Sequence, residues 1–167
     1  SGWTVFGVDV RPETMKEFKK YGGHPLENTS EAAKNCELML LMVINEKQCE
    51  EVLFGEKGGC KNFHEGFVVI NCSTVSSEFA KNTATRLKKL MTGYLDAPVS
   101  GGTKGARNGT LSIMVSGPED DLKKSRPVLE AISRKIYHLG LEAGLGSSMK
   151  MINQLLVGIH IVSAAEA

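Results

Sequence analysis

The chain has 167 residues and a formal net charge of +1, from 20 Lys and Arg residues against 19 Asp and Glu residues. This length predicts one domain with a sizeable core and is short for two. Because the charge is balanced, composition gives no support for nucleic acid or an anionic membrane as the main partner.

The cysteines are spaced too widely for a paired C-x-x-C zinc or redox motif, at Cys36, Cys49, Cys60 and Cys72. Three of them border or lie in apolar runs. We therefore interpret them as small core residues in a reducing compartment, with a disulfide framework as the alternative. No signal peptide is apparent, so we expect a cytoplasmic protein. The cysteine spacing leads us to expect no metal site.

Apolar runs alternate with helical patterns along the chain. Residues 3–8 predict a strand that ends at Asp9, and Pro12 opens a helix to about Tyr21. Further strands are predicted at 38–43, 67–71, 94–99, 111–115 and 136–139, with helices at 30–34, from 46, up to about 90 and at 119–133. Unbroken apolar strands between helices predict a mostly parallel sheet covered on both faces. The expected fold is α/β and doubly wound, or Rossmann-like.

The end of the chain predicts a helix that is buried on nearly every side, because residues 151–165 carry no fixed charge. Its polar residues make it a poor membrane span. Ser147 is the expected cap of this helix, and Gly144 and Gly146 leave room for close backbone approach. The helix amino end would also favour an anionic carboxylate.

Lys150 lies one turn inside this helix, with Asn153 and Gln154 on the same face. Burial destabilises an ammonium relative to its neutral amine, which turns a lysine into a proton-transfer group near neutral pH. The alternative is a first-turn lysine whose stem packs while its nitrogen reaches water. The stretch alone leaves both interpretations open.

Short polar residues or bare glycines follow four of the predicted strands, at the strand ends where ligands of doubly wound sheets bind. They are Asp9, Asn45, Ser73 with Thr74, and Ser100 with Gly101 and Gly102. Each position also fits an ordinary turn or helix cap. We interpret Asp96 as structural, because it lies inside its strand end.

Asp9 predicts the cofactor. An acidic residue at this strand end accepts hydrogen bonds from the adenosine ribose hydroxyls, which favours NAD and repels the phosphate of NADP. Arg11, two residues further on, opposes this preference. Its guanidinium could stack on adenine or pair with a phosphate. NAD is thus the expected cofactor and NADP the alternative. No Gly-rich phosphate loop precedes Asp9 in this sequence, although one is expected about 20 residues upstream.

Two motifs resemble those of a known family. They are Asp-Ala-Pro-Val-Ser-Gly-Gly at residues 96–102 and Gly-Leu-Gly-Ser-Ser-Met-Lys-Met-Ile-Asn at residues 144–153. In this order and at this separation they resemble the β-hydroxyacid dehydrogenases, which include 3-hydroxyisobutyrate, tartronate semialdehyde and 6-phosphogluconate relatives. Residues 71–75 and 111–117 also match, so the resemblance covers essentially the whole chain. The last helix looks most like the threonate dehydrogenase branch.

The resemblance implies roles for five residues around the substrate. Lys150 would be the general acid/base, taking the hydroxyl proton as hydride leaves the adjacent carbon. Ser100 and the backbone of Gly101 and Gly102 would hold the substrate carboxylate. Asn153 would hydrogen-bond a substrate hydroxyl or carboxylate and help to orient Lys150.

The resemblance also implies four residues around the nicotinamide. Val43, Ile44 and Asn45 would line its side, where the family often has Leu-Pro-Asn, so a turn set by proline is missing here. Thr74 would contact the nicotinamide or its ribose.

The resemblance further implies the domain organisation. Residues 1–145 would form a dinucleotide-binding domain that lacks its first strand and Gly-rich loop. Residues 146–167 would be an interdomain helix that opens an all-α domain, through which the protein forms a homo-oligomer.

Three functions follow as hypotheses. The first is oxidation of a small hydroxy acid, such as the sugar acid threonate, with a nicotinamide cofactor. The second, motivated by Arg11, is an NADPH-dependent reductase of a short semialdehyde. The third is a non-catalytic nucleotide-binding or oligomerisation module, like a chromatin-associated family member that lacks the lysine; the presence of Lys150 disfavours it.

Overall fold

The structure is a computed structural model that describes residues 2–167. Its elements follow the expected alternation of strands and helices. In chain order they are β1 (Phe6–Gly7), α1 (Pro12–Lys20), β2 (His24–Pro25), α2 (Thr29–Ala33), β3 (Leu38–Leu41), α3 (Glu46–Phe54), the 3-10 turn η1 (Gly59–Lys61), β4 (Val68–Asn71), α4 (Ser77–Lys88), β5 (Gly93–Asp96), β6 (Val99–Ser100), α5 (Gly102–Arg107), β7 (Leu111–Val115), α6 (Glu119–Ile132), β8 (Ser133–His138) and α7 (Leu145–Glu166).

The strands pair in three groups. β1 pairs with β2, β3 and β5 flank β4, and β6 and β8 flank β7. All of these pairs are parallel except β6 with β7. An antiparallel bridge between Asp96 and Ser116 joins the end of β5 to the residue after β7. The mostly parallel sheet expected from the sequence is therefore confirmed.

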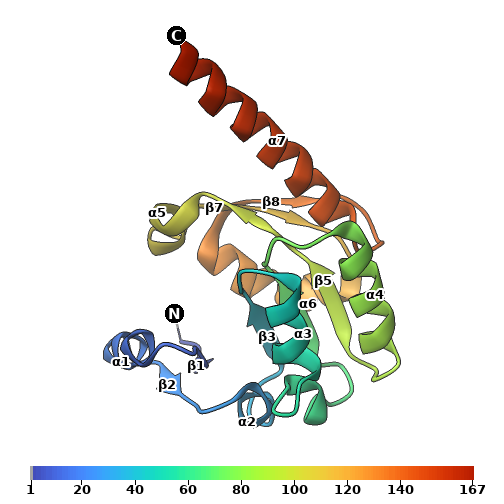
Figure 1. Ribbon diagram of the computed structural model, residues 1–167. Coiled ribbons are helices and arrows are strands. Elements are labelled where there is room, and N and C mark those ends of the chain that lie inside the picture. The colour runs from blue at the N-terminus through green and yellow to red at the C-terminus, as the bar shows by residue number, and fades with distance from the viewer. Residues whose placement is uncertain (1) are drawn as a thin grey trace.

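Helices cover both faces of the central strand β4, which is buried along its whole length. On one face Val69 packs in a cluster with Leu53 of α3 and Leu87 of α4. On the other face Ile70 packs in a second cluster with Leu129 of α6. Figure 1 shows α3 and α4 on one side of this sheet and α6 on the other. This two-sided cover makes the fold doubly wound and Rossmann-like.

Local sequence signals set the helix starts of the main body. Asn45 accepts a hydrogen bond from the Gln48 backbone N–H at the start of α3. Ser76 does the same for the Phe79 N–H at the start of α4. Such side-chain caps satisfy donors that have no partner inside the helix.

Several strands differ in extent from the expectation, and one of them is divided at a proline. The strand predicted at 94–99 is two strands, since the chain breaks at Ala97 and Pro98 and β6 then runs antiparallel to β7. The strand predicted at 3–8 shortens to Phe6–Gly7. Pro25 does not interrupt this pair, because the Leu26 N–H after it still donates to the Gly7 carbonyl oxygen at 2.9 Å. Proline has no N–H to donate to a sheet ladder.

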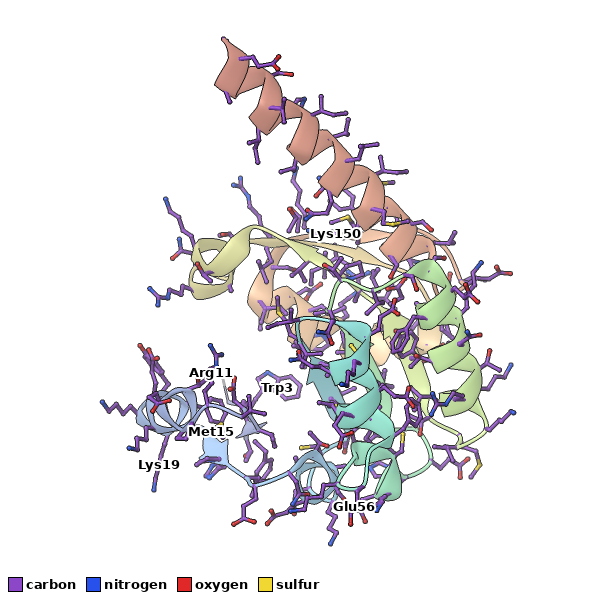
Figure 2. All side chains as sticks on the ribbon, in the orientation of Figure 1. Trp3, Arg11, Met15, Lys19, Glu56 and Lys150 are labelled. Carbon is purple, nitrogen blue, oxygen red and sulfur yellow. The ribbon has the colours of Figure 1, made fainter. Side chains whose placement is uncertain are left out.

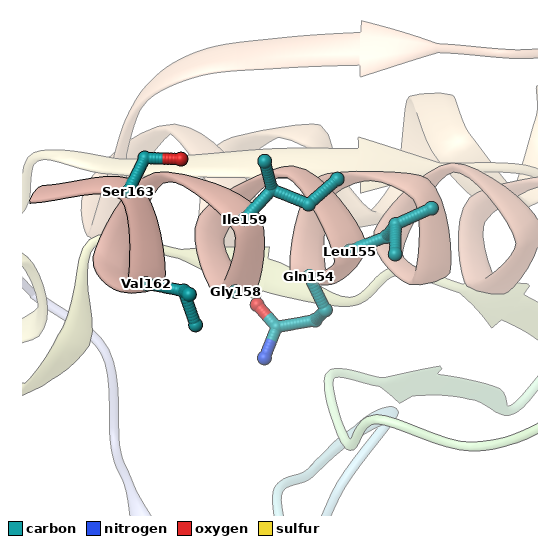
Figure 3. Close-up of a pocket in the computed structure, with 6 residues that line it drawn as sticks. All are labelled: Gln154, Leu155, Gly158, Ile159, Val162 and Ser163. Atoms are coloured by element: carbon teal, nitrogen blue, oxygen red, sulfur yellow. The ribbon is translucent and has the colours of Figure 1, made fainter. Parts of the chain in front are cut away.

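Within residues 2–167 the predicted burial of α7 is not found for most of its length. Residues from Met151 onward are exposed except for Asn153, which is half-buried. Figure 1 shows the helix projecting away from the sheet, and among residues 2–167 no other element lies against its outer part. A shallow groove on this part is lined by Gln154, Leu155, Gly158, Ile159, Val162 and Ser163 (Figure 3). The apolar side chains are exposed because nothing described faces them.

Candidate active site

The start of α7 is held by hydrogen bonds at the ends of β5 and β7. Its N-cap is Gly144, in a left-handed conformation with φ 99°, so Ser147 is not the cap as expected from sequence. A glycine cap has no side chain to accept a hydrogen bond from the helix. The Asp96 carboxylate replaces it: Oδ2 accepts from the backbone N–H of Gly144 at 2.9 Å and of Ser147 at 2.8 Å.

Two serines complete this contact. The Ser147 hydroxyl donates to Asp96 Oδ1 at 2.7 Å, and the Ser116 hydroxyl accepts from the Gly146 N–H at 3.0 Å. Burial raises the pKa of the Asp96 carboxyl, while the hydrogen bonds from Ser147, Gly144 and Ser116 oppose that rise. The helix amino end is thus already occupied by a protein carboxylate. It is not free to bind the carboxylate of a ligand, as the sequence had suggested.

Lys150 is buried one turn further along α7, with 8% of its surface exposed. Burial lowers the pKa of its ammonium. Among residues 2–167 no carboxylate forms an ion pair with it. Figure 2 labels Lys150 at the base of α7, where the helix meets the sheet. A buried lysine without a counter-ion is unusual in a structural role, because desolvation is not offset.

Asn153 adds a second unsatisfied group on the same face of α7. Its side-chain oxygen Oδ1 is buried and has no hydrogen-bond partner among the described residues. Buried amide oxygens in proteins are almost always hydrogen-bonded, so this oxygen fits a ligand hydroxyl. Gln154, next in the chain, is exposed.

The loop after β3 is held by hydrogen bonds instead of a proline. The Val43 N–H donates to Ser73 Oγ at 2.9 Å, and the Ile44 N–H donates to Gln48 Oε1 at 2.9 Å. A proline at position 44 would have no N–H to donate. This chain has Ile44 there, and the hydrogen bond from its N–H to Gln48 fixes the turn. Asn45 is engaged as the cap of α3.

The side chains that follow β4 differ in exposure. Ser73 is buried and joins the ends of β3 and β4 through its bond to Val43. Thr74 is exposed beside it. Thr74 is therefore free to meet a ligand at this strand end, whereas Ser73 has a structural partner.

The loop after β6 leaves its backbone open. Ser100 ends β6 and is half-buried, and Gly101 and Gly102 are exposed, with φ values of 129° and 59°. These left-handed conformations favour glycine. At Gly102 an added Cβ would meet nothing within 4 Å, so the backbone conformation and not space requires glycine there.

Asp9 and Arg11 lie in a separate part of the molecule, in the group formed by β1, α1 and β2 (Figures 1 and 2). The Arg11 guanidinium donates to Asp9 Oδ2 at 3.1 Å, with side-chain exposures of 70% for Arg11 and 26% for Asp9. Hydrogen bonds from Arg11 lower the pKa of the Asp9 carboxyl. Within residues 2–167 no hydrogen bond joins this pair to the other predicted site residues.

Sequence reasoning missed the part played by Asp96 and Ser116. Both were visible only as polar residues at strand ends, and Asp96 meets Ser147 across 51 positions of chain. One signal was available. The helix start Gly144-Leu-Gly146 offers no capping side chain of its own, so a cap from elsewhere in the fold is required.

Comparison with known proteins identifies the family. Residues 1–140 match the family model described as the NAD binding domain of 6-phosphogluconate dehydrogenase. The chain belongs to this family. The resemblance to β-hydroxyacid dehydrogenases inferred from the two motifs is thereby confirmed.

Relatives agree with this assignment. The chain is 41% identical to L-threonate dehydrogenase of Cupriavidus necator, covering 100% of this chain and 56% of the relative. It is 38% identical to L-threonate dehydrogenase of Escherichia coli K12, over 100% of this chain and 56% of the relative. A crystal structure of 3-hydroxyisobutyrate dehydrogenase from Salmonella typhimurium superimposes with a TM-score of 0.93 at 34% identity, over 99% of this chain and 57% of that one. The chain thus spans little more than half the length of these relatives.

Among residues 2–167 no three His, Cys, Asp or Glu side chains gather where they would hold a metal ion. In the same part of the chain no helix has the length and apolar character to cross a bilayer. All four cysteines are free thiols, and burial raises the pKa of Cys60 to about 11 and of Cys72 to about 12.

Proposed function

We propose that the protein is an NAD(P)-dependent dehydrogenase of small hydroxy acids. The observation that carries the proposal is the buried, unpaired Lys150 beside the unpartnered oxygen of Asn153. Both lie on one helix face, at the carboxyl side of the parallel strands in a family of NAD binding domains. A cationic and an acceptor group without protein partners suit a ligand that carries hydroxyl groups and negative charge.

Lys150 would exchange a proton with the substrate hydroxyl. The bound nicotinamide supplies the hydride acceptor in the oxidative direction. The neutral amine of Lys150 takes the hydroxyl proton, and the ammonium returns it in the reverse direction. Burial aids this role because it increases the fraction of neutral amine near neutral pH.

Ser100 and the backbone of Gly101 and Gly102 would hold the substrate carboxylate. Two facts support this placement: the loop backbone is exposed, and the amino end of α7 is already filled by Asp96. Asn153 Oδ1 would accept from a second substrate hydroxyl. A polyhydroxy acid fits these donors and acceptors better than a plain carboxylic acid.

The cofactor would extend along the strand ends. Val43, Ile44, Asn45 and Thr74 would line the nicotinamide side, and the exposed Thr74 hydroxyl fits a ribose. Asp9 keeps 26% of its side-chain surface exposed, so it remains able to accept from the adenosine ribose. NAD is the proposed cofactor because a carboxylate here repels the phosphate of NADP.

Threonate is the proposed substrate. Its support comes from relatives named L-threonate dehydrogenase at 41% and 38% identity over the whole of this chain. The four free thiols fit a reducing, cytoplasmic compartment. The homo-oligomer stays a prediction.

Hydride transfer by the full-length protein tests the proposal. The protein is assayed with NAD against L-threonate, 3-hydroxyisobutyrate and glycerate, together with Lys150→Met and the control Gln154→Ala. We expect threonate to give the highest kcat/KM and Lys150→Met to lower kcat by about 10²–10⁴-fold, the usual contribution of a general acid/base. Equal rates for wild type and Lys150→Met would refute the mechanism, and a preference for another acid would refute the substrate.

The second candidate, an NADPH-dependent reductase of a short semialdehyde, is favoured by the exposed guanidinium of Arg11. Turnover with NADPH and NADH separates the two functions. Arg11→Ala should weaken binding of NADPH and leave NADH binding nearly unchanged, whereas Asp9→Ala should weaken NADH binding. A wild type that uses NADPH at least 10-fold better than NADH would replace the first proposal by the second.

A further inference from the structure

Asp96 is a buried carboxylate without a counter-ion. Its residue is 0% exposed, and no lysine or arginine among residues 2–167 forms an ion pair with it. Such a group lowers stability unless hydrogen bonds replace the lost water. The side-chain hydrogen bonds that replace it come from the start of α7 and from Ser116. The carboxylate is therefore devoted to one contact between the sheet and this helix.

The contact also allows no sliding of the helix. A Cβ built on Gly146 would lie 2.5 Å from the carbonyl oxygen of Met114 and 2.6 Å from that of Asp96. The helix backbone therefore rests directly on β5 and β7. Gly144 and Gly146 have no side chains that could pack into the sheet surface. The position of the helix along this surface is therefore set by the hydrogen bonds that Asp96 and Ser116 accept from its backbone.

The same residue connects both halves of the proposed site. Asp96 begins the segment that ends in Ser100, Gly101 and Gly102, and its carboxylate holds Ser147, one turn before Lys150. A shift of α7 relative to β5 would move Lys150 relative to the proposed carboxylate loop. Misplacement of a reacting group by about 1 Å costs on the order of 100-fold in rate.

We propose that Asp96 is a positioning residue that caps α7 from the end of β5 and thereby fixes Lys150 in its buried place beside the Ser100 loop. The inference rests on the proposed role of Lys150 and adds the group that sets its environment. Burial is the one cause that lowers the pKa of Lys150, so a loosened helix start should expose its nitrogen to more water and let that pKa rise.

Titration of Lys150 in the full-length protein tests this directly, by NMR of a carbon-labelled lysine side chain in wild type, Asp96→Asn and Asp121→Asn. Asp121 is the matched control, because it is a half-buried carboxyl beside Gly93, at the opposite end of β5 from Asp96. We expect the pKa of Lys150 to rise in Asp96→Asn and to stay at the wild-type value in Asp121→Asn.

Amide exchange and kinetics supply readouts that general destabilisation does not imitate. The amides of Gly144 and Ser147 should exchange at least 10-fold faster in Asp96→Asn than in Asp121→Asn. In the dehydrogenase assay kcat should fall by about 100-fold, with a smaller change in KM. The pH at which activity rises should move upward together with the pKa of Lys150.

The outcomes are distinct for the two proposals. If the wild type transfers no hydride, the proposed function fails, while the titration and the amide exchange still decide the part played by Asp96. If Asp96→Asn does not fold, Ser147→Ala replaces it, since that variant removes the 2.7 Å hydrogen bond and leaves the carboxylate in place. It should raise the pKa of Lys150 by a smaller amount. An unchanged titration of Lys150 in the folded variant would overturn the inference.

Discussion

The start of α7 and the rest of the same helix differ in burial. The polar residues at the start are buried, whereas the apolar residues further along are exposed. Gly146, Ser147 and Lys150 are buried, whereas Leu155 and Ile159 are exposed to 63% and 50%. The polar residues are covered because Asp96, Ser116 and the sheet meet them. Burial of a helix face thus depends on which elements pack against it. Hydropathy alone indicates only which side chains would be stabilised by such packing.

The largest expected effect on stability comes from adding a methyl group at the docked turn. Gly146→Ala places a Cβ against the carbonyl oxygens of Met114 and Asp96, which belong to backbone that has little freedom to move. We expect activity to fall by about 100-fold and the unfolding free energy to fall by roughly 1–3 kcal/mol. Steady-state kinetics and urea unfolding measure both. Wild-type activity in this variant would show that the helix start is not docked as described.

A smaller effect is expected on removing the buried charge. Lys150→Met should raise Tm at neutral pH by about 2–4 °C, the shift that ~1 kcal/mol gives in a domain of this size. The folded-state pKa of Lys150 is lowered, so the unfolded chain binds more protons, and wild-type stability rises as pH rises from the folded pKa to the ordinary lysine value. The gain from Lys150→Met should therefore shrink over that range. A pH-independent gain would argue against a buried ammonium.

The exposed part of the helix offers the matched control to the docked glycine. A Cβ at Gly158 would meet nothing within 4 Å. Gly158→Ala should stabilise the protein by roughly 0.5–1 kcal/mol through helix propensity and leave kcat unchanged. Thermal unfolding checks the sign. If Gly158→Ala is as harmful as Gly146→Ala, the two halves of the helix do not differ in the way described.

The smallest expected effect is at the apolar surface of the same segment. Leu155→Gln should change the unfolding free energy by no more than about 0.5 kcal/mol, the range usual for exposed positions. Urea unfolding provides the measurement. A loss of roughly 2 kcal/mol or more would mean that this side chain is covered in the whole protein, and the contrast along α7 would then hold only for residues 2–167.

Much of the fold could be predicted from local sequence, because the signals are local. The apolar run of β4, the caps Asn45 and Ser76 and the order of strands and helices all appear in the structure. The division of the strand at Pro98 was readable from the proline but was not predicted.

The site was predictable in part, for a different physical reason. Lys150 and Asn153 stood out because they are polar residues in an uncharged helix. In the structure Lys150 is a buried residue, and Asn153 Oδ1 is a buried atom without a partner among the described residues. The cap of that helix could not be derived, since Asp96 and Ser147 are brought together only by the tertiary fold. The exposure of Leu155 was likewise beyond the sequence, because it depends on the elements that face it.

Chemical rescue tests the central claim most directly. If Lys150 is the proton-transfer group, Lys150→Ala leaves a vacancy that a small amine can fill, and added ethylamine should restore hydride transfer from L-threonate to NAD in a saturable manner. The restored rate should rise with pH as ethylamine loses its proton. A Lys150→Ala protein that transfers hydride at the wild-type rate without ethylamine would contradict the account.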